Sequence, residues 1–196
     1  IWDCSTGACR QMLRHTAVVQ SAVFSGDGSN VLTASSDTTA KIWDCSTGVG
    51  KHTLSGHDGC VHSAVYSEDG SLVLTASTDA TAKIWDSSTG ESKHTLVGHT
   101  GSLLSAVFSG DGSSVLTAAA DSTAKIWDSS TGTCKQTLSG HSDTVRSVVF
   151  SGDGSSALTA SCDNTAKIWD CSTGVCKQTL SGHSGELLSA VFSAGW

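Results

Sequence analysis

The chain has 196 residues, a net charge of −7, and 38% hydrophobic but only 15% charged residues. This balance argues against a disordered chain, and no apolar run approaches the roughly 18 residues of a membrane span. No basic and apolar leader of the secretory type opens the sequence. The eleven Lys and Arg are spread evenly, which argues against a nucleic-acid-binding surface, because such a surface needs clustered positive charge.

One unit recurs along the chain with a period of about 42 residues. The tripeptide Ile-Trp-Asp occurs five times, with its tryptophan at positions 2, 43, 85, 127 and 169. A Gly-His pair recurs in step with it at residues 56–57, 98–99, 140–141 and 182–183, and His15 stands at the matching place in the first copy. Such a period predicts a repeat architecture. We expect repeats over residues 1–41, 42–83, 84–125 and 126–167, and a partial repeat over 168–196.

Each copy is expected to form four short strands in the same order. In the second copy they cover residues 51–54, 61–67, 72–77 and 81–86. Val, Ile, Thr and aromatic residues fill these runs, while Gly, Asp and Ser separate them. An Asp-Gly pair at residues 69–70 predicts a hairpin turn between the second and third strands, because glycine tolerates the positive φ that such turns need. No segment sustains the 3.6-residue periodicity of a helix.

The predicted strands are apolar or small on both faces. In the fourth strand of the second copy, Ala82 and Ile84 point one way while Lys83 and Trp85 point the other. Four strands cannot bury two such faces alone, so neighbouring copies must cover them. The sequence therefore predicts an all-β array in which each repeat is stabilised by the next.

The recurring motifs resemble those of the WD40 repeat family. The repeating unit combines Gly-His, an Asp-Gly turn, a Ser-x-Asp turn and a closing Ile-Trp-Asp, with Arg14 before the histidine of the first copy and Ala119 in place of the serine of the third, and the resemblance covers the whole chain. It implies a β-propeller of four-stranded antiparallel blades around a channel. The chain supplies about four complete blades plus partial terminal strands. We expect it to be part of a larger propeller, with completion by a second copy as the alternative.

The resemblance also implies a hydrogen-bond chain inside each blade, from Asp to His, from His to a Ser or Thr hydroxyl, and from the indole N–H to that hydroxyl. With serine as the hydroxyl, the predicted members are His15, Ser35, Asp37 and Trp43; His57, Ser77, Asp79 and Trp85; His99, Asp121 and Trp127; and His141, Ser161, Asp163 and Trp169. The third set has Ala119 at the hydroxyl place, so we expect the indole of Trp127 to lack its acceptor. Ser, His and Asp together also suggest a hydrolase triad, but their recurrence at identical spacing favours a structural role.

The eight cysteines do not predict a metal site. Cys4, Cys45 and Cys171 occupy a place that holds serine in two other copies, and no C-x2-C motif occurs. Bridges between Cys4 and Cys9 or between Cys171 and Cys176 are geometrically conceivable. Free thiols in a reducing compartment are favoured, so an intracellular and most simply cytoplasmic location is expected, with no cofactor and no metal.

A few places differ between copies whose framework barely changes. Five residues after the motif histidine stand Gln20, His62, Leu104, Arg146 and Leu188, and just before the turn aspartate stand Ser36, Thr78 and Cys162. In the WD40 family these regions face the narrow end of the channel, where peptides and proteins dock. The resemblance therefore implies a noncatalytic scaffold for protein or peptide partners within a larger complex. Drift at tolerant surface positions is the alternative origin of this variation.

Two other functions remain open from the residues alone. The low divergence between copies fits a designed or recently duplicated repeat protein that has no specific ligand and closes by self-association. A hydrolase is less favoured, because no catalytic set stands outside the repeat.

Overall fold

The computed structural model describes residues 1–193, within which the chain forms sixteen β-strands and no helix. The strands are β1 (Val19–Phe24), β2 (Asn30–Ser35), β3 (Ala40–Asp44), β4 (Gly50–Leu54), β5 (Val61–Tyr66), β6 (Leu72–Ser77), β7 (Thr81–Asp86), β8 (Ser92–Val97), β9 (Leu103–Phe108), β10 (Ser114–Ala119), β11 (Thr123–Asp128), β12 (Cys134–Ser139), β13 (Val145–Phe150), β14 (Ser156–Ser161), β15 (Ala166–Asp170) and β16 (Cys176–Leu180). Nothing in this range could cross a membrane as a long apolar helix.

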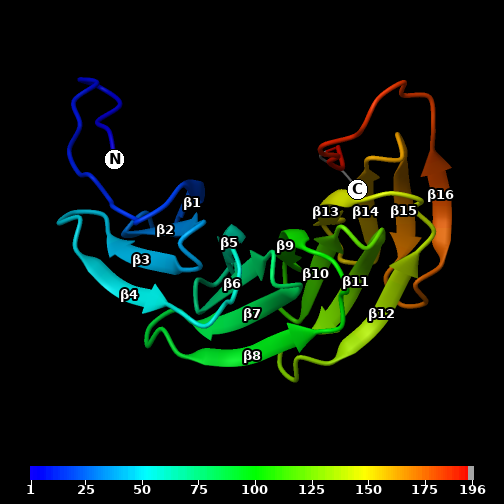
Figure 1. Cartoon of the computed structure of the whole chain (residues 1–196), viewed down its shortest axis with the longest axis horizontal. Helices are drawn as coiled ribbons and strands as arrows, with labels where there is room; N and C mark the ends of the chain where they lie inside the picture. Colours follow the sequence, from blue (N-terminus) through cyan, green and yellow to red (C-terminus); the bar gives the residue numbers. More distant parts are fainter. Residues whose placement is uncertain (194–196) are drawn as a thin grey trace.

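The strands form four separate four-stranded antiparallel sheets, each a simple meander. Blade 1 contains β1–β4, blade 2 contains β5–β8, blade 3 contains β9–β12 and blade 4 contains β13–β16. The blades follow one another around an open arc, with β1, β5, β9 and β13 on its concave side and the fourth strand of each blade on the outer rim (Figure 1). This arrangement confirms the expected all-β architecture of propeller blades.

An aspartate fixes the hairpin turn between the first two strands of each blade. In blade 2, Asp69 accepts hydrogen bonds from the Ser67 hydroxyl (2.6 Å) and from the backbone N–H of Ser71 (3.0 Å). Gly70 follows with φ of 73°, in the left-handed region that glycine enters without steric cost. The Ser67 hydroxyl, followed by the Ser71 backbone, lowers the pKa of Asp69 to about 2, so the turn stays intact near neutral pH.

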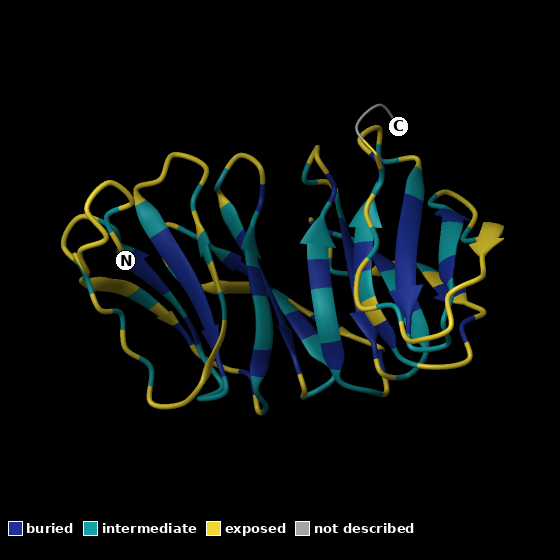
Figure 2. Cartoon of the chain, turned by 90° about the horizontal axis from the view of Figure 1, so that it is seen from above, coloured by how far each residue is buried: buried dark blue, intermediate teal, exposed yellow. Residues whose placement is uncertain are grey.

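The hydrophobic core lies between blades. One face of blade 1, which we call its leucine face, consists of Leu32, Ala34, Ala40, Ile42 and Leu54. It packs on the opposite face of blade 2, its tryptophan face, which consists of Val61, Ala64, Val73 and Trp85. Two further clusters join blade 2 to blade 3 and blade 3 to blade 4 in the same way. Buried residues accordingly occupy the middle of the stacked strands, and exposed residues occupy loops and outer strands (Figure 2).

The expected partial strands at the two ends of the chain are hardly formed. Near the N-terminus, Trp2 and Cys9 make a single antiparallel bridge. Residues 187–192 have the sequence of a fifth inner strand but contain no strand. A strand needs a hydrogen-bonded neighbour, and within residues 1–193 these two segments make no strand pairing beyond that single bridge.

Candidate partner-binding surface

A buried hydrogen-bond chain runs through each blade, and threonine is its hydroxyl member. In blade 2, the Trp85 indole donates to Thr75 Oγ1 (2.9 Å), Thr75 Oγ1 lies 2.7 Å from His57 Nε2, and His57 Nδ1 lies 2.8 Å from Asp79 Oδ2. An indole can only donate and an ionised carboxylate can only accept. The threonine hydroxyl therefore donates to Nε2, and the imidazole is neutral with its proton on Nδ1.

The other three blades repeat this chain with the same residue types. The members are His15, Thr33, Asp37 and Trp43 in blade 1; His99, Thr117, Asp121 and Trp127 in blade 3; and His141, Thr159, Asp163 and Trp169 in blade 4. The assignment of the hydroxyl to Ser35, Ser77 and Ser161 is thus wrong. Threonine lies two residues earlier on the same side of the strand, where it reaches both the indole and the imidazole.

The serines bond to the backbone instead. Ser161 Oγ donates to the carbonyl of Asp143 (3.0 Å) and accepts from the N–H of Asp163 (3.1 Å), so it ties two loops together. The prediction that Ala119 deprives Trp127 of its acceptor is also wrong, because Trp127 donates to Thr117 at 2.9 Å. With the serines facing the backbone, Ser, His and Asp do not form the relay of a hydrolase.

Burial holds the framework histidines neutral. The side chains of His57, His99 and His141 are at most 1% exposed. Desolvation lowers the pKa of each below its usual value, against the opposing effect of the aspartate beside it. Burial alone would raise the pKa of Asp79, but hydrogen bonds from Thr81 and His57 outweigh it and lower that pKa.

The lowered pKa values of these histidines predict that the protein loses stability as the pH falls from about 6.5 to 5. In the unfolded chain a histidine binds a proton near its usual pKa of 6.5, whereas the folded chain keeps His57, His99 and His141 neutral to lower pH. Stability falls wherever the unfolded state binds more protons. The urea midpoint should therefore be constant above pH 7 and drop between pH 6.5 and pH 5. Aspartates titrate below about pH 4 and do not contribute in this range. A urea midpoint that stays constant between pH 6.5 and pH 5 would therefore contradict the neutral state of the buried histidines.

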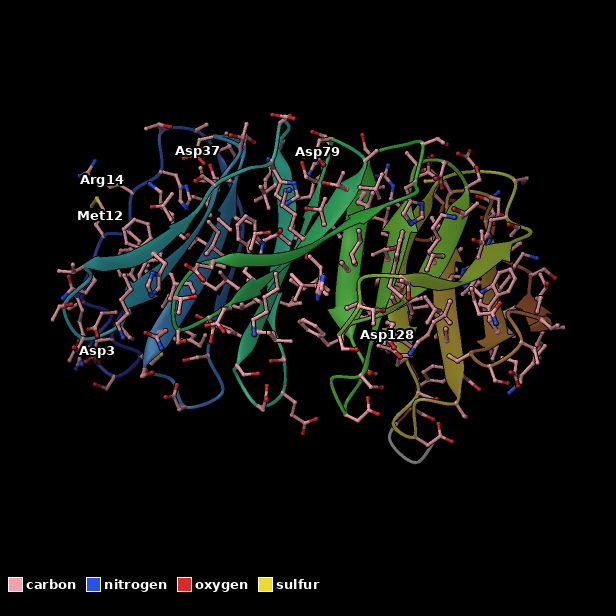
Figure 3. The ribbon with its side chains drawn as sticks, turned by 90° about the horizontal axis from the view of Figure 1, so that it is seen from below. Asp3, Met12, Arg14, Asp37, Asp79 and Asp128 are labelled. Carbon is pink, nitrogen blue, oxygen red and sulfur yellow. The ribbon has the colours of Figure 1, made fainter. Side chains whose placement is uncertain are left out.

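The same aspartates shape the loops at one edge of the arc. Asp79 Oδ1 accepts from the Thr81 N–H (2.9 Å) and hydroxyl (2.7 Å), and Asp79 Oδ2 accepts from the N–H of Asp58 (3.0 Å). The intervening Ala80 has φ of 65°, which costs a residue with a Cβ about 1–2 kcal/mol. Asp37 and Asp79 lie at one edge of the molecule and Asp128 lies at the opposite edge (Figure 3).

Each inner strand carries a β-bulge near its start. The pairing register skips one residue between Val19 and Ser21 in blade 1, and the same skip occurs in the other three blades. The skipped residues are Gln20, His62, Leu104 and Arg146, which are four of the residues that vary between copies. A bulge leaves its extra residue outside the ladder and re-aims the side chain. The sequence does not reveal the bulges, because the motif histidine and the bulge residue are five residues apart in all four blades and no copy stands out.

In blades 1 and 4 the variable places contact one another. Gln20 Nε2 donates to Ser36 Oγ at 2.8 Å in blade 1, and Arg146 Nε donates to Cys162 Sγ at 3.2 Å in blade 4. Gln20, Thr78 and Arg146 are exposed, whereas His62, Leu104, Ser36 and Cys162 are partly buried. We call these seven residues the bulge ring.

Further contacts link the bulge ring to the segments that follow it, from blade 1 to blade 2, from blade 2 to blade 3, and from blade 4 to the segment after β16. Ser36 Oγ lies 3.2 Å from Cys60 Sγ of blade 2. Ser102 Oγ of blade 3 donates to the carbonyl of Thr78 at 3.4 Å, and Cys162 Sγ donates to Glu186 at 3.3 Å. Leu188 is the fifth of the residues that stand five places after the motif histidine. It lies in the segment after β16, which forms no strand, and is 68% exposed.

The cysteines and acidic residues offer no chelating site in the part of the chain that the structure describes. All eight cysteines carry free thiols. Within residues 1–193, no three or more His, Cys, Asp or Glu side chains gather in a way that could hold a metal ion.

Comparison with known proteins identifies the repeat. The family described as WD domain, G-beta repeat (WD40) matches residues 7–44, 48–86, 90–128 and 132–170, which together make up more than half of the chain. Similar curated proteins include the nuclear distribution protein PAC1 of Arthroderma otae, of Arthroderma benhamiae and of Trichophyton verrucosum. Each is 43% identical over 61 residues, which is 30% of this chain and only 13% of the relative's length.

Proposed function

Because the chain belongs to the WD40 repeat family, we propose that it is a noncatalytic scaffold whose bulge ring docks a protein or peptide partner. The observation that carries this proposal is the position of the four bulges. They lie at the same place in every blade, yet they present Gln20, His62, Leu104 and Arg146, four side chains of different chemistry. The leucine faces of the same blades keep one residue type at each place.

The chemistry of the bulge ring fits a mixed apolar and polar partner. Leu104 and Arg146 occupy adjacent blades, and an arginine beside apolar side chains is a frequent composition of energetically important interface positions. Arg146 is the only cation of the bulge ring, so a dedicated phosphate reader is disfavoured. The suitable ligand is a peptide segment that places an apolar side chain on Leu104 and a hydrogen-bond acceptor at Arg146. The net charge of −7 disfavours nucleic acid.

We also place the protein in a reducing compartment, most simply the cytoplasm. The eight cysteines are free thiols, and several of them are exposed. Exposed unpaired thiols are typical of proteins kept reduced inside the cell. The 61 residues shared with the nuclear distribution proteins span less than two repeats, so they support the fold and a scaffold role and do not specify a partner.

The proposal is tested by the double variant Leu104→Ala/Arg146→Ala. Immobilised wild-type protein should capture a defined set of partners from a lysate of the source cells, and the double variant should lose the principal one by more than about tenfold. Truncating two central interface residues often costs more than 1 kcal/mol each. The measurement is quantitative mass spectrometry of the captured proteins.

A matched control lies on the outer rim. Val97→Ala/Val175→Ala also shortens two exposed side chains, 72% and 61% exposed, but leaves the bulge ring intact. It should retain every partner, and both double variants should keep the wild-type far-UV circular dichroism spectrum. Equal capture by the ring variant and the control would remove the bulge ring as the docking surface.

A further inference from the structure

A cavity of about 610 Å³ lies between blades 3 and 4. Lys135 lines it and pairs with Asp128 at 3.0 Å. Asp128 lies at the edge of the molecule opposite Asp37 and Asp79 (Figure 3), so the cavity and the bulge ring lie at opposite edges and share no residue. We call it the interblade cavity, and its lining includes Glu68, Ser114, Ile126, Lys135, Phe150 and Cys171.

The volume of the cavities between blades follows the size of one variable side chain. The second strand begins with Asn30 in blade 1, Leu72 in blade 2 and Ser114 in blade 3. The cavities lined by these residues have volumes of about 270, 170 and 610 Å³ in the same order. Leu72 packs into the core between blades 2 and 3. The shorter Ser114 leaves the corresponding space open between blades 3 and 4.

The buried part of the lining is apolar. Ile126 is 2% exposed, and Phe150 and Cys171 are partly buried against the core between blades 3 and 4. Burial raises the pKa of the Cys171 thiol to about 11, so this wall carries no charge at neutral pH. An apolar lining of this size is typical of pockets for small organic molecules, which have volumes of about 300–1,000 Å³.

Carboxylates dominate the charge of the lining. In the part of the chain that the structure describes, the lining contains one ammonium group, that of Lys135, and four carboxyl groups, those of Glu68, Asp111, Asp153 and Asp170. Serine hydroxyls, followed by the backbone of the turns, lower the pKa of Asp111 and Asp153 to about 2, so both are ionised at neutral pH. Lys135 is already paired with Asp128. The interblade cavity therefore favours a cation over an anion.

Glu68 is the carboxylate that is free to pair with a ligand. The other three turns of this kind have glycine at its place, so the charge is an addition to the repeat. A Cβ on Gly110 would lie 3.6 Å from Glu68 Oε2, which shows that the carboxylate lies against the turn of blade 3. Within residues 1–193, no Lys, Arg or His side chain forms an ion pair with Glu68.

We propose that the interblade cavity binds a small organic cation, with an apolar or aromatic body against Ile126 and Phe150 and an ammonium group near Glu68. The volume and the apolar lining select the body of this ligand, and the excess of carboxylates selects its charge. A metal ion does not fit, because no chelating group of three or more His, Cys, Asp or Glu exists among the described residues.

Dansylcadaverine is the probe, because it joins a fluorescent naphthalene body to a primary ammonium group. Its emission should rise and saturate at one molecule per chain. Dansyl-6-aminohexanoate has the same body but ends in a carboxylate, and it should bind at least about tenfold more weakly. Because exposed charges are screened by salt, raising NaCl from about 20 to about 500 mM should weaken the binding of the cation several-fold. The absence of saturable binding, or equal affinity for the two probes, overturns the proposal.

Ser114→Leu locates the site, because it fills the interblade cavity with the residue that blade 2 has at the same place. It should weaken binding of dansylcadaverine by more than about tenfold, since a filled interior has no room for the ligand. Ser156→Leu is the matched control: it makes the same change at the same place in blade 4, outside the lining, and should bind the probe as the wild type does. Unchanged affinity of a folded Ser114→Leu variant overturns the proposal.

Glu68→Gln tests the charge at an exposed position, where the fold is not at risk. It should weaken binding of the cation about threefold, as expected for loss of an exposed ion pair. Glu91→Gln removes another exposed carboxylate, one that does not line the interblade cavity, and should have no effect. Equal affinities of these two variants would contradict the role of Glu68.

Cys171 provides a measurement on the wild type that needs no variant. Bound dansylcadaverine should slow its reaction with N-ethylmaleimide, measured by fragmentation mass spectrometry. Cys45 stands at the same place in blade 1 and is also partly buried, so it should react at an unchanged rate. Saturable binding without protection of Cys171 places the ligand elsewhere and overturns the proposal. Capture of partners by the bulge ring can succeed or fail independently of all these results.

Discussion

Replacing Leu96 by Ala should lower the free energy of unfolding by about 3 kcal/mol, whereas the same change at Leu180 should cost less than about 1 kcal/mol. The two leucines occupy the same place in blades 2 and 4, but Leu96 is 1% exposed and packed on blade 3, while Leu180 is 39% exposed. The difference measures what a neighbouring blade contributes. Urea unfolding of the wild type and of both variants provides the measurement.

Leu54 and Leu138 extend the comparison to the contact between blades 1 and 2 and to the contact between blades 3 and 4. Both are fully buried between blades, so Ala at either position should behave as Ala does at position 96. Similar losses in the free energy of unfolding at all four leucines would mean that a blade buries its leucine face without a neighbour. The hydrophobic core would then not lie between blades.

Thr75→Val should destabilise the protein by about 3 kcal/mol although valine has nearly the shape of threonine. The change leaves the indole N–H of Trp85 without an acceptor and His57 Nε2 without a donor, both in a buried environment. Each unsatisfied buried group costs about 1–3 kcal/mol. Urea unfolding gives the free energy, and the indole N–H resonance of Trp85 should shift in the NMR spectrum of the folded variant.

Ser77→Ala in the same strand is the matched control. Ser77 is as buried as Thr75, but its hydroxyl accepts only from the N–H of Asp79, at 3.2 Å. Blade 3 already has Ala119 at this place, so the cavity is tolerated. The expected cost is about 1 kcal/mol, with the Trp85 resonance unmoved. A larger loss from Ser77→Ala than from Thr75→Val would favour serine as the functional hydroxyl.

The strands could be predicted from the sequence because the signals that specify them are local. The expected strands over residues 72–77 and 81–86 coincide with β6 and β7, since alternating β-branched and apolar residues end at Asp-containing turns on both sides. The stacking of blades also followed from local pattern, because strands with two apolar faces need cover on both.

The hydroxyl member of the buried network could not be predicted in the same way. Thr75 and Ser77 are two residues apart in β6, so their side chains point to the same face and the two-residue period cannot distinguish them. The choice depends on how far along the strand the His57 ring reaches, which is a property of the folded loop. The bulge at His62 is equally invisible, because it changes pairing and leaves the spacing of the motifs unaltered.

The similarity of the contacts between blades affects how the folding chain places its blades in the correct succession. The leucine faces are identical in all four blades, and the tryptophan faces differ by single apolar residues such as Leu103 in blade 3 and Val145 in blade 4, so side-chain packing gives blade 2 little basis for choosing between these two neighbours. The succession of blades is set by tethers, such as the six residues between Leu54 and Val61, which permit contact only with the adjacent unit. Loss or duplication of one whole 42-residue unit by recombination would therefore leave every remaining junction intact. Refolding at high concentration, in contrast, should exchange blades between molecules.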